Sequence, residues 1–104
     1  MKTGSQYDVT DFQGEVLRRS YEVPVLVDFW AEWCGPCKIL GPILERLVAE
    51  TGTEGDGKWV LAKVNTEEFP DVASTYQIYS IPNVKLFHEG KVLTEFVGDR
   101  KSVV

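Results

Sequence analysis

Apolar and polar residues follow one another along the chain in a pattern that predicts four β-strands. Segments 25–31 and 59–64 are apolar almost throughout and rich in residues that favour strands. Such runs are typical of strands covered on both faces of a sheet. Segments 84–88 and 91–97 are joined by a two-residue Glu-Gly connection, which indicates a hairpin. We therefore expect the last two strands to be antiparallel.

Apolar residues recur at helical spacing in three other segments. Segment 8–21 is expected to be a helix with Asp11 as its N-cap, because Asp side chains accept hydrogen bonds from free N–H groups. Segment 34–50 has one broad apolar stripe, made of Ile39, Leu40, Ile43, Leu44, Leu47 and Val48. Pro42 lies inside this segment and should kink the helix, because proline removes a backbone hydrogen bond. Segment 67–76 is expected to be a shorter helix.

The order of these elements predicts the fold class. A helix, a strand, a helix, a strand and a helix are followed by two strands, so the first part forms a parallel βαβ crossover and the end adds a hairpin. We expect an α/β fold in which helices cover both faces of a mixed sheet, a three-layer α/β/α sandwich. The length of 104 residues fits a single domain over 1–104.

Composition and charge narrow the function classes. Apolar residues make up 43% of the chain, which is enough for a packed core. The net charge of −5 makes nucleic acid an unfavourable partner, because phosphate binding needs a basic surface. No apolar run approaches the roughly 20 residues of a membrane-spanning helix. Residues 1–6 lack the apolar stretch of a signal peptide. The expected location is therefore the cytoplasm, away from membranes.

Cys34 and Cys37 are the only cysteines, and their C-x-x-C spacing predicts either a redox pair or half of a metal site. Cys34 follows a predicted strand and opens a predicted helix. The partial positive charge and free N–H groups of a helix start favour a thiolate, so the pKa of Cys34 should fall. Cys37 lies one helical turn further on, on the same face. It could therefore attack a mixed disulfide formed by Cys34.

Two other interpretations of the pair are weaker. A tetrahedral zinc site needs four ligands, and only His88 remains as a further candidate, on a distant strand. We therefore expect no metal. A purely structural disulfide between Cys34 and Cys37 would close too small a loop to stabilise the fold much.

The residues around this pair resemble a known family. Residues 27–38, Val-Asp-Phe-Trp-Ala-Glu-Trp-Cys-Gly-Pro-Cys-Lys, closely resemble the active-site segment of the thioredoxin family. Residues 80–84 resemble its cis-proline loop, residues 87–92 its terminal hairpin, and Val97 with Gly98 its closing residues. The resemblance covers residues 23–98. It implies the thioredoxin fold and a protein-disulfide reductase that needs no cofactor beyond a redox-active Cys34–Cys37 disulfide.

The resemblance also implies roles for two charged residues. Asp28 matches an Asp that lies behind the second cysteine and serves Cys37 as general base or acid. Burial raises the pKa of a carboxyl group, which suits proton transfer near neutral pH. The alternative is that Asp28 has no catalytic role, and that its carboxylate either accepts local hydrogen bonds inside the protein or reaches solvent. Lys63 matches a lysine near that Asp, and its alternative is an ordinary strand lysine whose ammonium group reaches water.

Further residues are implied to contact substrates. Pro82 matches a cis proline that faces the cysteines and shapes a backbone edge for a substrate chain. The whole implied set is Trp33, Gly35, Pro36, Thr66, Ser80, Ile81, Pro82, Val97 and Gly98. Ser80 stands where many relatives have Gly, and Asn83 where many have Thr. We expect the same chemistry, with a substrate preference that these two positions can alter.

The end of the chain departs from the family pattern. Only six residues follow Gly98, too few for the terminal helix that usually packs on the sheet. We expect that helix to be missing or truncated and apolar area to be exposed on one face. A truncated chain, a longer parent protein and a second copy covering this face are the alternatives. The polar loop 51–58 is also longer than in the family pattern.

The resemblance implies partners of two kinds. These are disulfide-containing protein substrates and a reductase of the thioredoxin-reductase type, dependent on flavin or ferredoxin, that restores the electrons. The rival hypothesis is a thioredoxin-fold binding or chaperone module that uses the same groove without turnover. The intact pair Cys34 and Cys37 argues against this rival.

Overall fold

The computed structural model describes residues 5–52 and 57–97 of the 104. Part of the predicted loop 51–58, Gly98 and the short segment after it lie outside the described residues. The predictions made for them are therefore not addressed by the structure.

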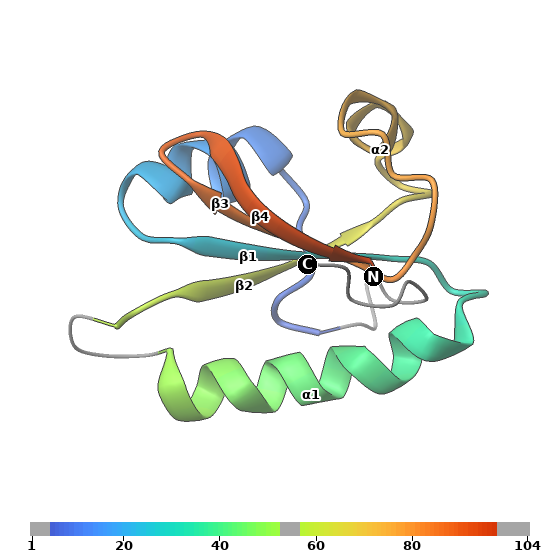
Figure 1. Cartoon of the computed structure of the whole chain (residues 1–104), viewed down its shortest axis with the longest axis horizontal. Coiled ribbons are helices and arrows are strands. Elements are labelled where there is room, and N and C mark those ends of the chain that lie inside the picture. Colours follow the sequence, from blue (N-terminus) through green and yellow to red (C-terminus); the bar gives the residue numbers. More distant parts are fainter. Residues whose placement is uncertain (1–4, 53–56, 98–104) are drawn as a thin grey trace.

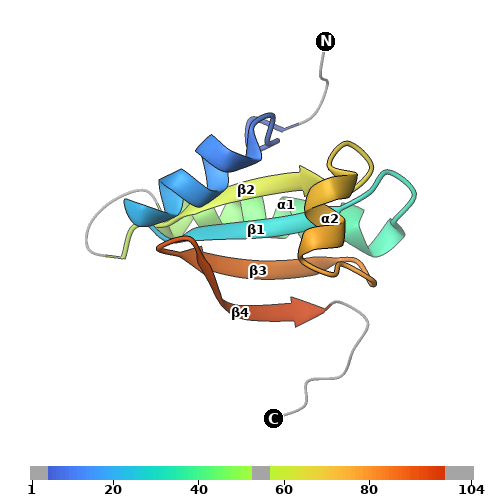
Figure 2. The same ribbon diagram turned by 90° about the horizontal axis from the view of Figure 1, so that it is seen from above.

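Four strands form one mixed sheet in the order β2-β1-β3-β4 (Figure 2). Strands β1 (Val25–Trp30) and β2 (Val60–Asn65) are parallel. Strand β3 (Asn83–His88) is antiparallel to β1, and β4 (Lys91–Val97) is antiparallel to β3. The predicted crossover and the predicted hairpin are both confirmed.

Helices cover both faces of this sheet, so the predicted three layers are confirmed (Figure 1). The long helix α1 (Gly35–Thr51) lies along one face and contains Pro42. The short helices η1 (Gln13–Arg18), η2 (Arg19–Tyr21) and α2 (Pro70–Thr75) lie on the other. None of the helices within the described ranges is both long and apolar enough to cross a membrane.

The first helix differs from its prediction. Its N-cap is Phe12 rather than Asp11, and it winds as a π-helix followed by a 3-10 turn. The Glu15 carboxylate reaches back to accept hydrogen bonds from the backbone N–H groups of Thr10 and Asp11, at 3.0 and 2.7 Å. The predicted N-cap is therefore wrong: the helix has no side-chain cap on its own first N–H groups, and the Glu15 carboxylate instead binds the N–H groups of the two residues before Phe12.

Helix α2 begins three residues later than predicted. Asn65, at the end of β2, accepts the backbone N–H groups of Glu68 and Phe69 on its carbonyl, both at 3.0 Å. These bonds form a turn that delays the helix. Pro70 then occupies the first turn of α2. Proline has no backbone N–H group, but no helical hydrogen bond is lost there, because the first N–H groups of a helix have no acceptor within it.

The two faces of the sheet have separate apolar cores. The larger core lies between the sheet and the helices η1 and α2, and its buried members are Val9, Phe12, Val16, Val25, Val27, Phe29, Ala62, Val64 and Phe87. The smaller core lies under α1 and consists of Leu44, Val48, Leu61 and Val84. Successive residues of β1 point to opposite faces, so this strand is packed on both sides.

Only part of the predicted apolar stripe of α1 is buried. Ile39, Ile43 and Leu47 are exposed, although Leu44 and Val48 on the same helix pack into the core. Phe96 of β4 is also exposed, and it pairs with Val84, which places it on the α1 face of the sheet. Exposed apolar side chains therefore lie on α1 and on the β4 side of this face.

Candidate active site

The two cysteines lie where β1 leads into α1. Cys34 is the N-cap of the helix, and its sulfur accepts a hydrogen bond from the backbone N–H of Cys37 at 3.2 Å. The two residues form a disulfide, with their Cα atoms 5.3 Å apart, and both are buried. An N–H group of the first helical turn is thus directed at Cys34 Sγ, and it would stabilise a thiolate there once the disulfide is reduced.

Asp28 is a buried carboxylate in the middle of β1, with no accessible surface and no hydrogen-bond partner for either side-chain oxygen. Burial raises the pKa of Asp28 to about 6, because the charged form loses its hydration. The positive charge of Lys63 opposes this rise, and the negative charge of Glu45 adds to it. A carboxyl group with such a pKa can accept or release a proton near neutral pH.

Asp28 and Cys37 lie on the same side of the sheet. Asp28 is directly opposite Lys63 in the β1–β2 register, so their side chains share one face. A Cβ atom on Gly41 of α1 would be 3.2 Å from the Lys63 ammonium nitrogen, so the helix passes directly over this lysine. Cys37 is four residues before Gly41, and both are buried on the inner side of α1. The second cysteine therefore faces the layer that contains Asp28.

Lys63 is held inside the protein rather than in solvent. Its ammonium nitrogen is 2.9 Å from a carboxylate oxygen of Glu45 on α1 and 5.4 Å from the centre of the Trp30 ring. The lysine side chain is only 15% exposed. The alternative of a strand lysine extending into water therefore does not describe this residue, and a row of three charges, Glu45, Lys63 and Asp28, lies under the helix.

The Ile81–Pro82 peptide bond is cis, as the resemblance implied. The loop leads directly into β3, whose first residue Asn83 pairs with Phe29 of β1. The cis-proline loop therefore lies at the end of β1, from which the chain continues to Cys34. Val97, the last residue of β4, pairs with Asn83 and lies at the same end of the sheet.

The remaining predicted residues lie next to the cysteines in the chain or at the ends of β1 and β2 that lead toward them. Trp33 is 69% exposed, and its indole N–H donates to a carboxylate oxygen of Glu67 at 2.9 Å. Gly35 and Pro36 form the exposed first turn of α1. Thr66 donates both its backbone N–H and its hydroxyl to the carbonyl of Trp30, at 2.9 and 3.2 Å. Thr66 thus ties the end of β2 to the end of β1.

Comparison with known proteins identifies the family. The family model "Thioredoxin" matches residues 5–104. The chain is 43% identical over 97 residues to a thioredoxin of Chlorobaculum thiosulfatiphilum, covering 91% of this chain and 84% of that protein. It is 44% identical over 98 residues to the mitochondrial thioredoxin of Mus musculus, of which it covers 55%, and 42% identical over 91 residues to the chloroplastic M-type thioredoxin of Spinacia oleracea, of which it covers 48%.

The chain belongs to the thioredoxin family. It is a protein thiol–disulfide oxidoreductase, and the Cys34–Cys37 disulfide is its redox-active group. Within residues 5–52 and 57–97, no group of three or more His, Cys, Asp or Glu side chains is arranged to hold a metal ion. His88 lies at the far end of β3, beside the residue that pairs with Val25, so it is remote from the cysteines.

Sequence reasoning missed two residues of this thioredoxin-family site. Glu45 lies beside the apolar stripe of α1, four residues after the buried Gly41, and its charge near the buried side of the helix could have indicated a partner such as Lys63 on the sheet below. Glu67 contacts Trp33 from the turn after β2, and no spacing or motif connects the two. The structure brings most of the predicted site residues to one end of the sheet, with Asp28 and Lys63 in the middle of their strands under α1; Gly98 lies outside the described residues.

Proposed function

We propose that this protein reduces disulfides in protein substrates. The Cys34 thiolate attacks one sulfur of the substrate disulfide, forming a mixed disulfide and releasing the other substrate sulfur as a thiolate. Cys37 then attacks Cys34 Sγ, which forms the Cys34–Cys37 disulfide and releases the second substrate thiolate. The observation that carries this proposal is the 3.2 Å hydrogen bond from the Cys37 N–H to Cys34 Sγ at the start of α1.

Asp28 is proposed to take the proton of Cys37 as that thiol attacks. Its pKa of about 6 leaves most of the carboxyl groups ionised at pH 7, and neither oxygen is occupied by a hydrogen bond. Its position under the inner side of α1 supports this role. Lys63 is a positioning residue, because its charge limits the rise in the pKa of Asp28.

Substrates are proposed to lie across the exposed surface around the disulfide. Trp33, Gly35 and Pro36 would contact the substrate from the side of α1. Ser80, Ile81 and cis Pro82 would contact it from the loop before β3, where a backbone edge can pair with an extended chain. Val97 at the end of β4, together with Thr66 and Gly98, completes the proposed contact set.

The wider setting follows from the chemistry. We propose that residues 1–104 act as one domain, with no cofactor beyond the disulfide, in a reducing compartment such as the cytoplasm. A flavin- or ferredoxin-dependent reductase of the thioredoxin-reductase type would restore the dithiol. The exposed apolar side chains of α1 are Ile39, Ile43 and Leu47. Their cover by a second copy stays a prediction, which size-exclusion chromatography would test, and their cover by further chain stays a prediction as well.

Insulin reduction tests the proposal. With dithiothreitol as the electron source, the wild-type protein should accelerate insulin precipitation well above the uncatalysed control, and Cys34→Ser should abolish the acceleration. Glu22→Gln is the matched control and should keep full activity, because Glu22 is exposed and follows η2, on the face of the sheet opposite α1. A wild-type rate equal to the uncatalysed rate would instead favour the binding-module hypothesis.

A further inference from the structure

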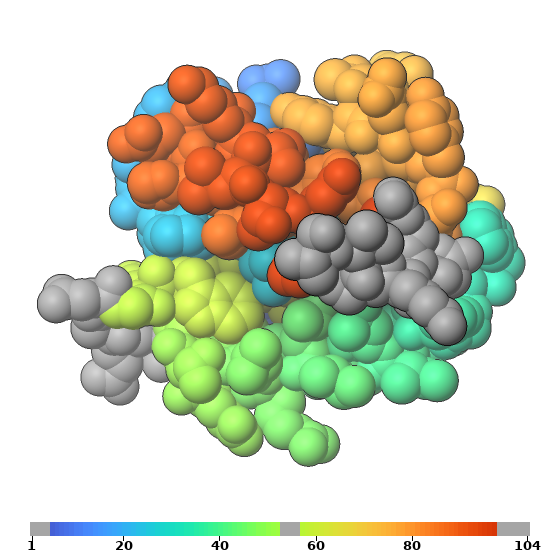
Figure 3. Space-filling model, viewed as in Figure 1, coloured from blue at the N-terminus to red at the C-terminus, as the bar shows by residue number. Residues whose placement is uncertain are grey.

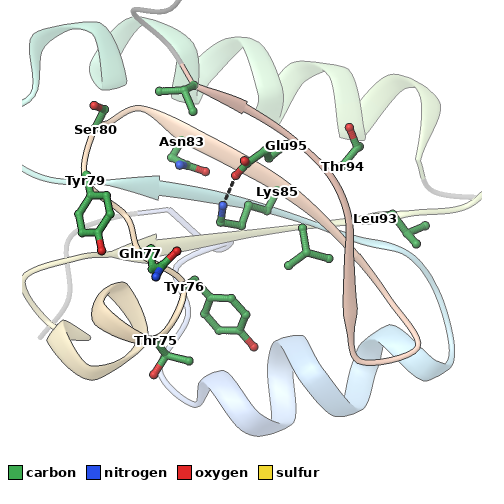
Figure 4. A pocket seen from close by; sticks show the side chains of 12 residues that line it. Thr75, Tyr76, Gln77, Tyr79, Ser80, Asn83, Lys85, Leu93, Thr94 and Glu95 are labelled. Atoms are coloured by element: carbon green, nitrogen blue, oxygen red, sulfur yellow. Dashed lines mark hydrogen bonds and ion pairs between the residues drawn. The ribbon is translucent and has the colours of Figure 1, made fainter.

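A cleft of about 600 Å³ opens on the face of the sheet opposite α1 (Figure 4). In Figure 3, its two walls, the segment around α2 and strand β4, lie side by side on the face toward the viewer. The cleft begins at Ser80 and Asn83, on either side of the cis peptide bond, and ends at Leu93. It is therefore continuous with the loop that we propose to contact the substrate.

Two charged residues meet in the middle of this cleft. Lys85 of β3 and Glu95 of β4 are directly opposite in the strand register and form an ion pair (Figure 4). The lysine side chain is 7% exposed, whereas the glutamate side chain is 49% exposed. On its other side, Lys85 pairs with Val27, a member of the larger apolar core. The ammonium group is thus buried and neutralised, and the carboxylate remains open to the cleft.

Asn83 lies between this ion pair and the cis-proline loop. It is 4% exposed, and its side-chain oxygen has no hydrogen-bond partner. A buried polar atom without a partner is costly, so its occurrence beside a cleft indicates a group that a ligand can satisfy. The side-chain amide of Asn83 has an NH2 group that donates and an oxygen that accepts. A rotation of the amide by half a turn exchanges their positions, so either group can face the cleft.

These groups define the chemistry of an occupant. An anion would meet the exposed carboxylate of Glu95, and a cation would compete for that carboxylate with the buried ammonium group of Lys85, which would then lose its partner. An uncharged group with both a donor and an acceptor can pair with the Asn83 amide and donate to Glu95 without disturbing the ion pair. A carboxamide side chain, as in glutamine or asparagine, has this combination.

The position of the cleft indicates which molecule supplies that group. The stretch of β4 from Leu93 to Val97 follows the cleft for about 13 Å, at ~3.3 Å per residue. An extended peptide of four or five residues fits this length. A substrate whose cysteine reacts with Cys34 and whose backbone meets the cis-proline loop would have its flanking residues directed here.

We propose that this cleft is a second substrate-contact site, which selects substrates with a glutamine or asparagine residue near the reacting cysteine. The inference rests on the proposed function, because it assumes that the chain reduces peptide disulfides. Asn83, Lys85 and Glu95 are its specificity-determining residues, and none of them takes part in the disulfide exchange itself.

A set of peptide disulfides tests this inference. Each peptide has one cysteine in a Ser/Ala background and one variable residue, Gln, Met, Lys or Glu, placed between two and six positions from the cysteine. The pre-reduced protein is mixed with each disulfide, and the second-order rate constant is measured from the thiol peptide released. At the best position, the Gln peptide should react about fivefold faster than the Met peptide, the effect of about one hydrogen bond. The Lys and Glu peptides should not exceed the Met peptide.

Variants show whether the peptide preference depends on the cleft or on another part of the protein. Asn83→Leu should bring the Gln/Met ratio close to one. Lys85→Met/Glu95→Gln, which replaces the ion pair by neutral side chains of similar shape, should also lower the ratio, and it tests the cleft if Asn83→Leu does not fold. Arg19→Met/Glu22→Gln makes the same chemical changes in an exposed ion pair elsewhere and should leave the ratio unchanged.

The outcomes distinguish the two proposals. Equal rates for the Gln and Met peptides, a faster Lys or Glu peptide, or a preference that survives in both cleft variants would overturn the cleft inference alone. If no peptide is reduced faster than in the absence of protein, the proposed function itself fails.

Discussion

Asp28 and Lys63 are direct neighbours on the parallel strands β1 and β2, on the face of the sheet that α1 covers. The lysine ammonium group nevertheless forms its ion pair with Glu45 of α1, at 2.9 Å, and both oxygens of Asp28 lack a partner. The carboxylate is thus near a positive charge without being neutralised by it. This arrangement explains why the pKa of Asp28 remains raised, and it leaves the carboxylate free to accept a proton.

Asp28→Asn should stabilise the oxidised protein at pH 7 to 8. The pKa of Asp28 is about 6 in the folded state and near 3.8 in the unfolded state, so the folded state holds its proton more tightly. The free energy of unfolding therefore falls as pH rises from about 4 to 6, by ~3 kcal/mol in total. The free energy of unfolding of Asp28→Asn does not fall in this way, because asparagine does not titrate. In urea denaturation the variant should therefore be more stable than the wild-type protein at pH 7 to 8, and this difference should disappear as pH is lowered to about 4.

The same substitution should slow catalysis. An amide cannot accept the proton of Cys37, so insulin reduction at pH 7 should fall by about 10²-fold. A variant that is more stable and less active supports the assignment of Asp28 as a proton acceptor. An Asp28→Asn protein with wild-type activity would reduce Asp28 to a buried structural residue.

Lys63→Met and Glu45→Gln should move the pKa of Asp28 in opposite directions. Removal of the positive charge of Lys63 should raise the pKa further, and removal of the negative charge of Glu45 should lower it. The measurement is a pH titration of the Asp28 side-chain carbon by NMR spectroscopy. Shifts of the same sign in both variants would contradict the row of charges described under α1.

Ser20→Ala should destabilise the protein by about 1–3 kcal/mol. Ser20 is fully buried, and its hydroxyl donates to the Leu17 carbonyl at 2.6 Å and accepts from the Gly90 N–H at 2.8 Å. The alanine variant leaves that N–H unpaired at the turn of the hairpin. Thr51→Ala, which removes an exposed hydroxyl bond to the Leu47 carbonyl, is the matched control and should change the denaturation midpoint little.

Strong local patterns made most of the fold predictable from sequence. The apolar run of β1 and the Glu-Gly connection before β4 specify their structures by burial and by turn geometry, and both appear as predicted. The start of η1 was not predictable in this way. An Asp before an apolar helix pattern predicts a side-chain cap, but here the carboxylate of Glu15 folds back onto the N–H groups of Thr10 and Asp11, and this choice depends on how the segment packs.

The candidate site was predictable where a residue belongs to a contiguous motif. Cys34, Cys37 and Asp28 lie within twelve residues of one recognisable segment. Lys85 shows the limit, since a lysine between two apolar residues of a strand is expected to point to solvent. Its burial depends on a hairpin register that brings Glu95 opposite it, and a register of that kind depends on long-range pairing.

The most direct test of the account is to trap the intermediate on Cys34. Reduced Cys37→Ser protein, mixed with a peptide disulfide and analysed by mass spectrometry after digestion, should retain one peptide on Cys34, because no second thiol can release it. Reduced Cys34→Ser protein should retain little or none on Cys37, because the first-turn N–H group that would stabilise a thiolate is directed at the sulfur of residue 34, and Cys37 faces the sheet under α1. Trapping on Cys37 at an equal rate, or no trapping in either variant, would contradict the assignment of Cys34 as the attacking thiol.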